Sequence, residues 1–170
     1  MFTQDIYYQR RKELSDAIGH GVVLFLGNEN LDIHYDRETR QFSQESSFFY
    51  YFGVSRPHLA AIIDIDLGRT AIFGDDPKDD TFFSDSIQTL RYEAAKAGVL
   101  DVLPYRPCLW DCFRVVGKQG RKTHFLPAVS NERLMTLSSV LGVAPENLEP
   151  SWELVDAVKA QRQLESLEEI

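Results

Sequence analysis

The sequence lacks the features that mark a secreted, membrane-bound or nucleic-acid-binding protein. No apolar segment follows its polar N-terminus, so we expect no secretory signal. Its longest apolar runs, such as residues 22–26, are far shorter than the ~20 residues of a membrane span. Acidic residues outnumber basic ones: the sequence has 26 Asp and Glu but 18 Lys and Arg, so its net charge is −8. These absences predict a cytoplasmic protein that binds neither membranes nor nucleic acid.

Cysteine is also scarce, and the two that are present do not predict a metal site. Cys108 and Cys112 are four residues apart and would share one face of a helix. The favoured interpretation is a pair of small apolar residues on a buried face, kept reduced in the cytosol. A metal site would need two further ligands, and the nearest histidine, His124, lies at no zinc-type spacing. We therefore expect no metal ligands and no cofactor in this chain.

No motif of a known catalytic centre is present. The sequence has no GxSxG nucleophile turn, no GxxxxGKS/T phosphate loop and no GxGxxG after a predicted strand. The histidines occur without HxxxH or HExxH pairing, at His20, His34, His58 and His124. From the residues alone we predict a domain without catalytic residues, in which His124 is a hydrogen-bonded structural histidine.

Two loops could nevertheless hold a cation or a small molecule, and the first of them could instead carry an acid/base pair. Residues 34–38 combine His34, Asp36 and Glu38, and residues 74–80 form the most acidic loop of the chain. Oxygen-rich loops bind hard cations, but the second loop lacks the alternating acidic positions and closing glutamate of an EF-hand. A solvated turn is the favoured interpretation there. A stand-alone module that binds a cation or small molecule stays open as the alternative function.

The composition and the periodicity predict an α/β fold. Hydrophobic residues make up 44% and charged residues 26%, and 170 residues are typical of one domain. Helices alternate with strands, and two strands flank a short turn as in a hairpin, so we expect a mixed sheet flanked by helices. The predicted helices are 3–18, 86–97, 108–116, 130–141 and one that starts at Ser151, with Gly117 ending the third; the predicted strands are 22–26, 59–65, 70–73, 99–103 and 124–126.

Five consecutive aromatic residues, Phe48–Phe52, follow a long polar segment, residues 29–47. Such a run is typical of a strand or short turn whose rings fill the core and an interface together, and direct contact with a ligand is the less favoured alternative. Long ordered loops are often functional, so the preceding segment is a candidate for function.

The C-terminal residues predict that another helix begins there. Ser166 and Glu169 have the spacing of a capping box, and Ile170 supplies the first apolar residue after it. A helix start with no helix behind it favours a chain cut inside a longer protein. A frayed acidic tail is the alternative.

Three segments, residues 8–14, 21–28 and 42–53, resemble the N-terminal domain of the aminopeptidase P, prolidase and creatinase family. Residues 59–66 and 158–170 match the same pattern, so the resemblance covers essentially the whole chain. Its most specific part is the motif carried by Phe42, Gln44, Ser46, Phe48, Tyr50 and Gly53. The resemblance implies a mixed sheet flanked by helices over residues 1–150. Residues 151–170 would then be a linker helix and the start of a C-terminal catalytic domain.

The resemblance also implies a function for the parent protein. Such enzymes hold two divalent ions, often manganese, with two Asp, one His and two Glu of the C-terminal domain, and hydrolyse the peptide bond before proline. None of these ligands falls in this chain. What the resemblance leaves for it is subunit association in a homo-oligomer and a wall at the active-site entrance, with its own catalytic domain as partner.

The entrance residues depart from the family pattern. The family usually has Trp-x-Gly after its acidic loop, where this chain has Phe83 and Asp85. An Asp usual before the motif falls at Arg37, with Asp36 beside it, so Asp36 and Phe83 are the expected entrance residues. Two further departures are Ser43 in place of Arg and Glu165 in place of Lys. They leave the expected fold unchanged and bear on specificity for proline.

Overall fold

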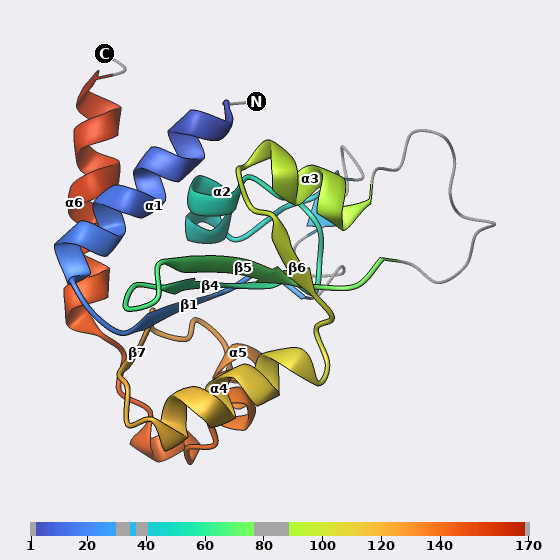
Figure 1. The fold of residues 1–170 in the computed structure, drawn as a ribbon, viewed down its shortest axis with the longest axis vertical. Coiled ribbons are helices and arrows are strands. Elements are labelled where there is room, and N and C mark those ends of the chain that lie inside the picture. Colours follow the sequence, from blue (N-terminus) through green and yellow to red (C-terminus); the bar gives the residue numbers. More distant parts are fainter. Residues whose placement is uncertain (1–2, 30–34, 37–40, 77–88, 169–170) are drawn as a thin grey trace.

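The fold is a five-stranded sheet with helices on both faces (Figure 1). The structure, a computed structural model, describes residues 3–29, 35–36, 41–76 and 89–168. The strand order is β6-β5-β4-β1-β7. Their bounds are β1 Val22–Leu26, β4 Ala60–Asp64, β5 Arg69–Phe73, β6 Asp101–Leu103 and β7 Thr123–Phe125; a separate ribbon pairs β2 Tyr35–Asp36 with β3 Gln41–Phe42.

The sheet is mixed, as the sequence predicted. β4 runs antiparallel to both β1 and β5, and the predicted hairpin joins β4 to β5. β7 runs parallel to β1, and β6 runs parallel to β5. All residues of β1 and β4 are buried, because helices cover both faces of these central strands. The α/β class and the flanked mixed sheet are therefore confirmed.

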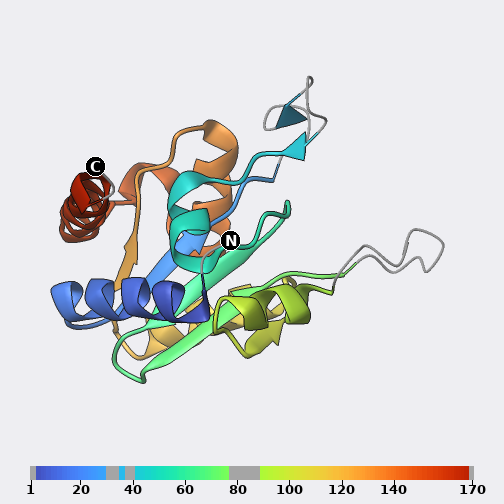
Figure 2. The ribbon, with the colours of Figure 1, turned by 90° about the horizontal axis from the view of Figure 1, so that it is seen from above.

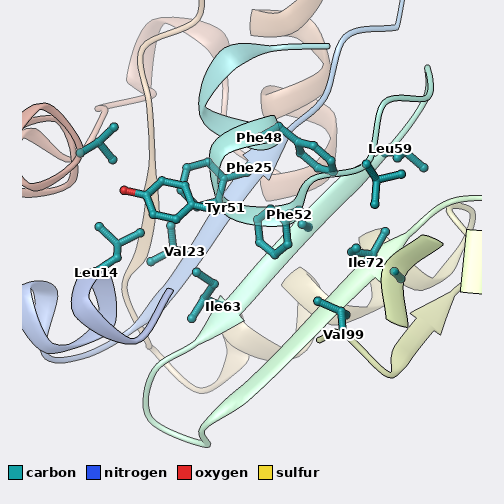
Figure 3. Close-up of a cluster of buried hydrophobic side chains, with 14 of the residues drawn as sticks. Leu14, Val23, Phe25, Phe48, Tyr51, Phe52, Leu59, Ile63, Ile72 and Val99 are labelled. Carbon is teal, nitrogen blue, oxygen red and sulfur yellow. The ribbon is translucent and has the colours of Figure 1, made fainter. Parts of the chain in front are cut away.

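The α-helices of the described residues flank the sheet and divide the core in two (Figure 1). One face packs against α1, α2, α3 and α6, and the other against α4 and α5. Figure 3 shows the first cluster, in which Phe25 of β1 contacts the rings of Tyr51 and Phe52. The bounds are α1 Gln4–Ile18, α2 Ser46–Phe52, α3 Leu90–Lys96, α4 Cys108–Lys118, α5 Asn131–Leu141 and α6 Trp152–Glu168, with a 3₁₀ turn at Pro145–Asn147.

The aromatic run is a helix, so the prediction of a strand or short turn is wrong. The Glu45 carboxylate accepts the N–H groups of Ser47 (3.1 Å) and Phe48 (2.7 Å) and caps the start of α2. Gly53, with a left-handed φ of 64°, ends it. Caps at both ends and burial of one face outweigh the strand preference of aromatic residues. The rings do fill the core, since Phe48 and two others are fully buried.

Two predicted helix boundaries are also wrong. α4 continues through Gly117 to Lys118, because a helical glycine is tolerated and nothing there forces the chain to turn. α6 runs without a break through Ser166 to Glu168, so Ser166 does not cap a new helix. No glycine or proline interrupts residues 152–168. The predicted start of α3 at residues 86–88 lies outside the described residues. Among the helices that are described, none is long and apolar enough to cross a membrane.

Candidate functional site

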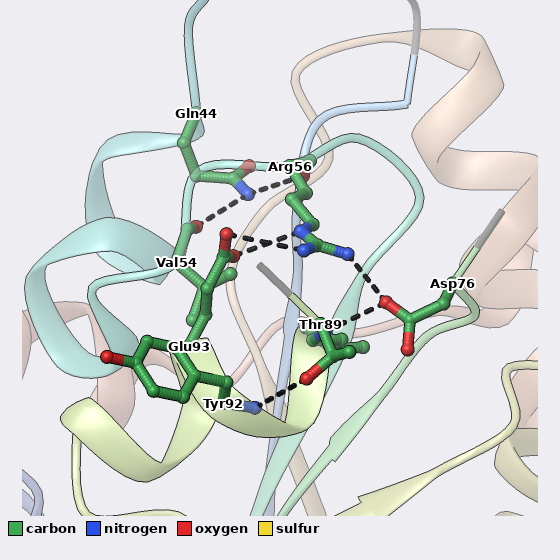
Figure 4. A network of polar contacts seen from close by, with 8 residues as sticks. Gln44, Val54, Arg56, Asp76, Thr89, Tyr92 and Glu93 are labelled. Atoms are coloured by element: carbon green, nitrogen blue, oxygen red, sulfur yellow. Dashed lines mark hydrogen bonds and ion pairs between the residues drawn. The ribbon is translucent and has the colours of Figure 1, made fainter. Parts of the chain in front are cut away.

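The family motif lies in and around α2, where Gln44 joins three segments of the chain. Its Oε1 accepts the backbone N–H of Asn28 at 2.9 Å, just after β1. Its Nε2 donates to the carbonyls of Val54 at 3.1 Å and Arg56 at 2.8 Å, on the path to β4 (Figure 4). Gln44 therefore satisfies backbone groups of irregular segments that no ladder reaches.

Two arginines of the segment 8–14 hold the C-terminal end of α2. Arg10 donates to the carbonyl of Tyr50 at 2.9 Å, and Arg11 donates to that of Tyr51 at 2.8 Å. Positive charge is favourable at a helix C-terminus. Burial lowers the pKa of Arg11 to about 10, so this guanidinium stays charged at neutral pH. The segments 8–14 and 42–53 thus meet in space.

The remaining motif residues also fix the packing around α2. Gly53 lies against the Tyr7 ring so closely that a Cβ there would be 2.5 Å from it. Ser46 accepts a hydrogen bond from Arg162 of α6 at 3.1 Å. Phe48 is buried in the cluster of Figure 3, and Phe42 is half-buried in β3. Tyr50 lies under the Arg10 guanidinium, 4.0 Å from ring centre to Cζ. The motif positions α1, α2 and α6.

The expected entrance residues are only partly described. Asp36 lies in β2, where the structure gives the backbone, and Phe83 lies outside the described residues, as do Arg37 and Asp85. Figure 2 shows the β2–β3 ribbon standing away from the five-stranded sheet. The roles of Asp36 and Phe83 at an entrance stay predictions.

The two other departures have visible contacts. The Ser43 side chain is exposed, and its carbonyl accepts from Asn28 Nδ2 at 3.0 Å. Glu165 pairs with the nearly buried Arg10 at 3.0 Å and joins α6 to α1. A lysine at position 165 would place a cation beside Arg10, so this departure suits its surroundings.

A cleft of about 940 Å³ opens at the edge of the sheet where β1, β5 and β6 end. Ligands of open α/β sheets bind outside the carboxyl ends of the strands, so this carboxyl-edge cleft is the candidate functional site. Residues that follow these strands, residues before β4 and one face of α5 line it, among them Glu29, His58, Asp76, Tyr105 and Trp110.

An ion-pair network around Arg56 forms one wall of the cleft (Figure 4). Arg56 pairs with Asp76, after β5, at 2.9 Å and with Glu93 of α3 at 3.0 Å. The same Asp76 oxygen accepts the backbone N–H of Leu90 at 2.8 Å, and Thr89 caps α3 by accepting from Tyr92 N at 3.2 Å. The network fixes the end of β5 relative to the start of α3.

Aromatic side chains form the opposite wall. Tyr105 donates to the Glu29 carboxylate at 3.0 Å, and burial together with this carboxylate raises the pKa of Tyr105. The rings of Tyr105 and Trp110 meet edge to face at 5.6 Å. Arg106 lies over the Trp110 ring at 3.9 Å, and Trp110 Nε1 donates to Ser139 at 3.0 Å. This wall offers flat apolar surface with hydrogen-bonding groups at its margin.

The backbone of His58 at the cleft has a left-handed φ of 60°, the only positive value among the described non-glycine residues. Its N–H donates to the carbonyl of Asn28 at 3.2 Å, and its side chain is exposed. Such a conformation costs on the order of 1–3 kcal/mol and is concentrated at functional sites.

The described residues of this cleft provide a surface for contact. Among them, no three His, Cys, Asp or Glu side chains converge in a way that could hold a metal ion, so no metal-dependent step is assigned to them. Cys112 is half-buried on α4, and burial raises the pKa of its thiol. His124 lies at the opposite edge, hydrogen-bonded to Ser151 Oγ at 2.8 Å and to the carbonyl of His20 at 2.9 Å, as predicted for a structural histidine.

The predicted cation loops are described only in part. In residues 34–38 the structure describes positions 35 and 36 alone, and in residues 75–80 only Asp75 and Asp76. One Asp76 oxygen is already engaged by Arg56 and by the Leu90 N–H. A cation site at these two loops stays a prediction.

Sequence reasoning missed the cleft residues Arg56, Tyr105 and Trp110. A signal was available, because Tyr105 follows a predicted strand by two residues and Arg56 precedes another by three. Strands that run in the same direction bring the residues after them to one edge. The pairing of the strands, which would have shown this, depends on contacts between distant residues.

A model of the aminopeptidase P N-terminal domain matches residues 7–104, more than half of the chain. No curated protein matches the chain in a sequence search.

Solved structures have the same fold over most of this chain. Icp55 from Saccharomyces cerevisiae matches with a TM-score of 0.60 and 17% identity, over 83% of this chain and 34% of its own. A zinc-substituted E. coli aminopeptidase P in complex with product matches with a TM-score of 0.61 and 16% identity, over 83% of this chain and 33% of its own. Proline aminopeptidase P II from Yersinia pestis matches with a TM-score of 0.59 and 16% identity, again over 83% of this chain and 33% of its own. The chain spans about a third of the length of these proteins.

Proposed function

Because the chain belongs to the aminopeptidase P N-terminal domain family, we propose that it is the non-catalytic N-terminal domain of a metal-dependent Xaa-Pro aminopeptidase or dipeptidase. The family match is the observation that carries this proposal. Residues 1–150 would be the domain itself, and residues 151–170 the linker helix and start of the catalytic domain. The parent enzyme, in the cytoplasm, would hydrolyse the peptide bond before proline.

In this proposal the metal ions belong to the catalytic domain. Two divalent ions, manganese in our proposal, would be held there and would supply the nucleophilic water. The described residues do not provide a fitting ligand set, so this chain would take no part in that step. Its own catalytic domain would be its partner.

The carboxyl-edge cleft supports a role at the entrance to an active site. Its two walls combine the Arg56 network with the Tyr105 and Trp110 rings, and its volume of about 940 Å³ is large enough for a peptide side chain. The rigid network would keep the wall in place while substrates pass. We further propose that the domain mediates association of subunits into a homo-oligomer.

The test is an activity assay on the purified chain. We expect no release of the N-terminal residue from an Xaa-Pro peptide, with or without added Mn²⁺, whereas a complete aminopeptidase P in the same assay is active. Turnover by the chain that a chelator abolishes would overturn the proposal.

The same preparation separates the alternative of a stand-alone cation-binding module. Such a module would show a saturable rise of the melting temperature with a divalent ion, following RT ln(1 + [L]/Kd). We expect no such rise.

Sedimentation tests the proposed association of subunits. A strict monomer at high concentration would contradict that role.

A further inference from the structure

A second cavity opens beside the end of β1, because the neighbouring strand β7 is shorter and ends earlier. β7 pairs with residues 22–24 of β1, whereas β1 continues to Leu26. The chain leaves the sheet at Leu126 and Pro127. The last residues of β1 therefore have no strand beside them on this side, and a cavity of about 710 Å³ lies there.

The walls of this cavity are mainly apolar. α6 contributes Val155 and Val158, α5 contributes Leu137, and the end of β1 contributes its side chains. Trp152 and Val129 also line it and are 64% and 83% exposed. Small-molecule sites are typically apolar clefts of roughly 300–1,000 Å³ with a few polar groups that orient the ligand. The cavity has this size and this composition.

The charged groups that line the cavity are mainly cations. Arg133, Lys159 and Arg162 contribute to its lining, and Glu45 is the one carboxylate among its described lining residues. That carboxylate is occupied, because both of its oxygens accept backbone N–H groups of α2.

None of these three cations has a carboxylate partner within the part of the chain that is described. Arg133 donates to the Leu26 carbonyl at 2.7 Å and to Asn28 Oδ1 at 2.8 Å, and Arg162 donates to the Ser46 hydroxyl. All these acceptors are neutral. A chain with a net charge of −8 thus gathers at one apolar cavity three cations that form no ion pair with the described residues.

We propose that this cavity binds a small amphipathic anion, with an apolar body and a single carboxylate head, of the class of a medium-chain fatty acid. The apolar body would lie along Leu137, Val155 and Val158. The carboxylate would meet Lys159 and Arg162, which are three residues apart and share one face of α6. Nothing in peptide-bond hydrolysis calls for such a site, so this inference goes beyond the proposed function.

Tryptophan fluorescence tests the proposal directly. The chain has two tryptophans, so the variant Trp110→Phe leaves Trp152 as the only reporter, at the cavity itself. We expect decanoate to change its emission with a saturable dependence. Decyltrimethylammonium, with the same tail and the opposite charge, should bind at least about tenfold more weakly, because its cationic head would be repelled by the two cations, Lys159 and Arg162, that attract the carboxylate.

A charge variant and a matched control sharpen the test. Lys159→Gln should weaken decanoate binding about three- to fivefold, and higher salt should weaken it as well. Lys12→Gln removes an exposed lysine of α1 away from the cavity and should leave binding unchanged. If Trp110→Phe fails to fold, the melting temperature of the unaltered protein with each probe gives the same comparison.

Equal affinity for the two probes would overturn the proposal, and so would equal loss in the two lysine variants. Either result would show an apolar surface without preference for anions, of the kind that another domain covers. No response of Trp152 to decanoate would overturn it too.

Discussion

The two ends of the sheet are built differently. At the carboxyl edge, a cleft of about 940 Å³ separates the Arg56 network from the aromatic wall. At the amino edge, Arg121 pairs with Asp64 and Asp66 and joins the β4–β5 turn to the segment before β7. Gly21 is fixed there as well, because its N–H donates to Asp66 at 3.0 Å.

The comparison indicates that the amino edge of the sheet stabilises the fold, whereas the carboxyl edge offers a surface for contact with other molecules. The amino edge satisfies its polar groups with each other over short distances, including those of His124. The carboxyl edge leaves flat rings, exposed charges and a strained His58 around open space. We therefore expect substitutions at the amino edge to reduce stability and those at the carboxyl edge to affect mainly contacts.

The largest effect should come from Gly21→Ala. Gly21 has φ of 90°, and a Cβ there would lie 2.6 Å from the backbone oxygen of Lys122. We expect a loss of about 3 kcal/mol or more of unfolding free energy, measured by urea denaturation. Gly19→Ala is the matched control, because φ is 87° but nothing lies within 4 Å of its Cβ, and it should cost about 1 kcal/mol. Equal losses would show that strain alone, without the close approach, sets the cost.

The next largest effect on the free energy of unfolding should come from substitutions in the two arginine networks. Arg121→Gln leaves Asp64, whose side chain is 8% exposed, without its cation, and should cost about 2–3 kcal/mol. Arg56→Gln should cost about 1 kcal/mol, because its partners Asp76 and Glu93 are more exposed. Both are measured by urea denaturation at low salt. A larger loss in Arg56→Gln would reverse the proposed difference between the edges.

The smallest effect is a pH dependence at His124. Burial lowers the pKa of His124, so the folded protein binds fewer protons than the unfolded chain near that pH. Its contribution to stability is complete above the unfolded pKa of about 6.5 and is lost as the pH falls toward the lower folded value. We expect the melting temperature to decrease below pH 6.5 and the decrease to be smaller in His124→Asn. An identical pH profile in the two proteins would contradict this assignment.

The parts of the fold set by local chemistry could be predicted from the sequence. The strand at residues 22–26, the hairpin and the helix capped by Ser130 all depend on apolar periodicity and turn residues, and the structure has them. The aromatic run was mispredicted for two reasons. Its helix is capped by Glu45, and glutamate is not among the residues usually preferred at an N-cap. It also packs against α1, which depends on contacts across about 40 residues, such as Arg11 with the Tyr51 carbonyl.

The candidate site was harder to predict for the same reason. Arg56 meets Asp76 and Glu93 across 20 and 37 residues of sequence, and Tyr105 meets Glu29 across 76. Such pairs become visible only when the order of the strands is known. His124, in contrast, could be assigned a structural role from its place in a short predicted strand.

The pairing of α1 with α6 has a consequence for how the chain folds as it is synthesised. Gln161 of α6 donates to the carbonyl of Arg10 at 2.8 Å, and this contact closes a loop of 151 residues. The entropic cost of closing a loop grows with its length, and contacts of high sequence separation slow folding. One side of α1 therefore stays uncovered until α6 has emerged from the ribosome. During that interval, chaperones and neighbouring nascent chains have access to the part of α1 that the finished domain covers.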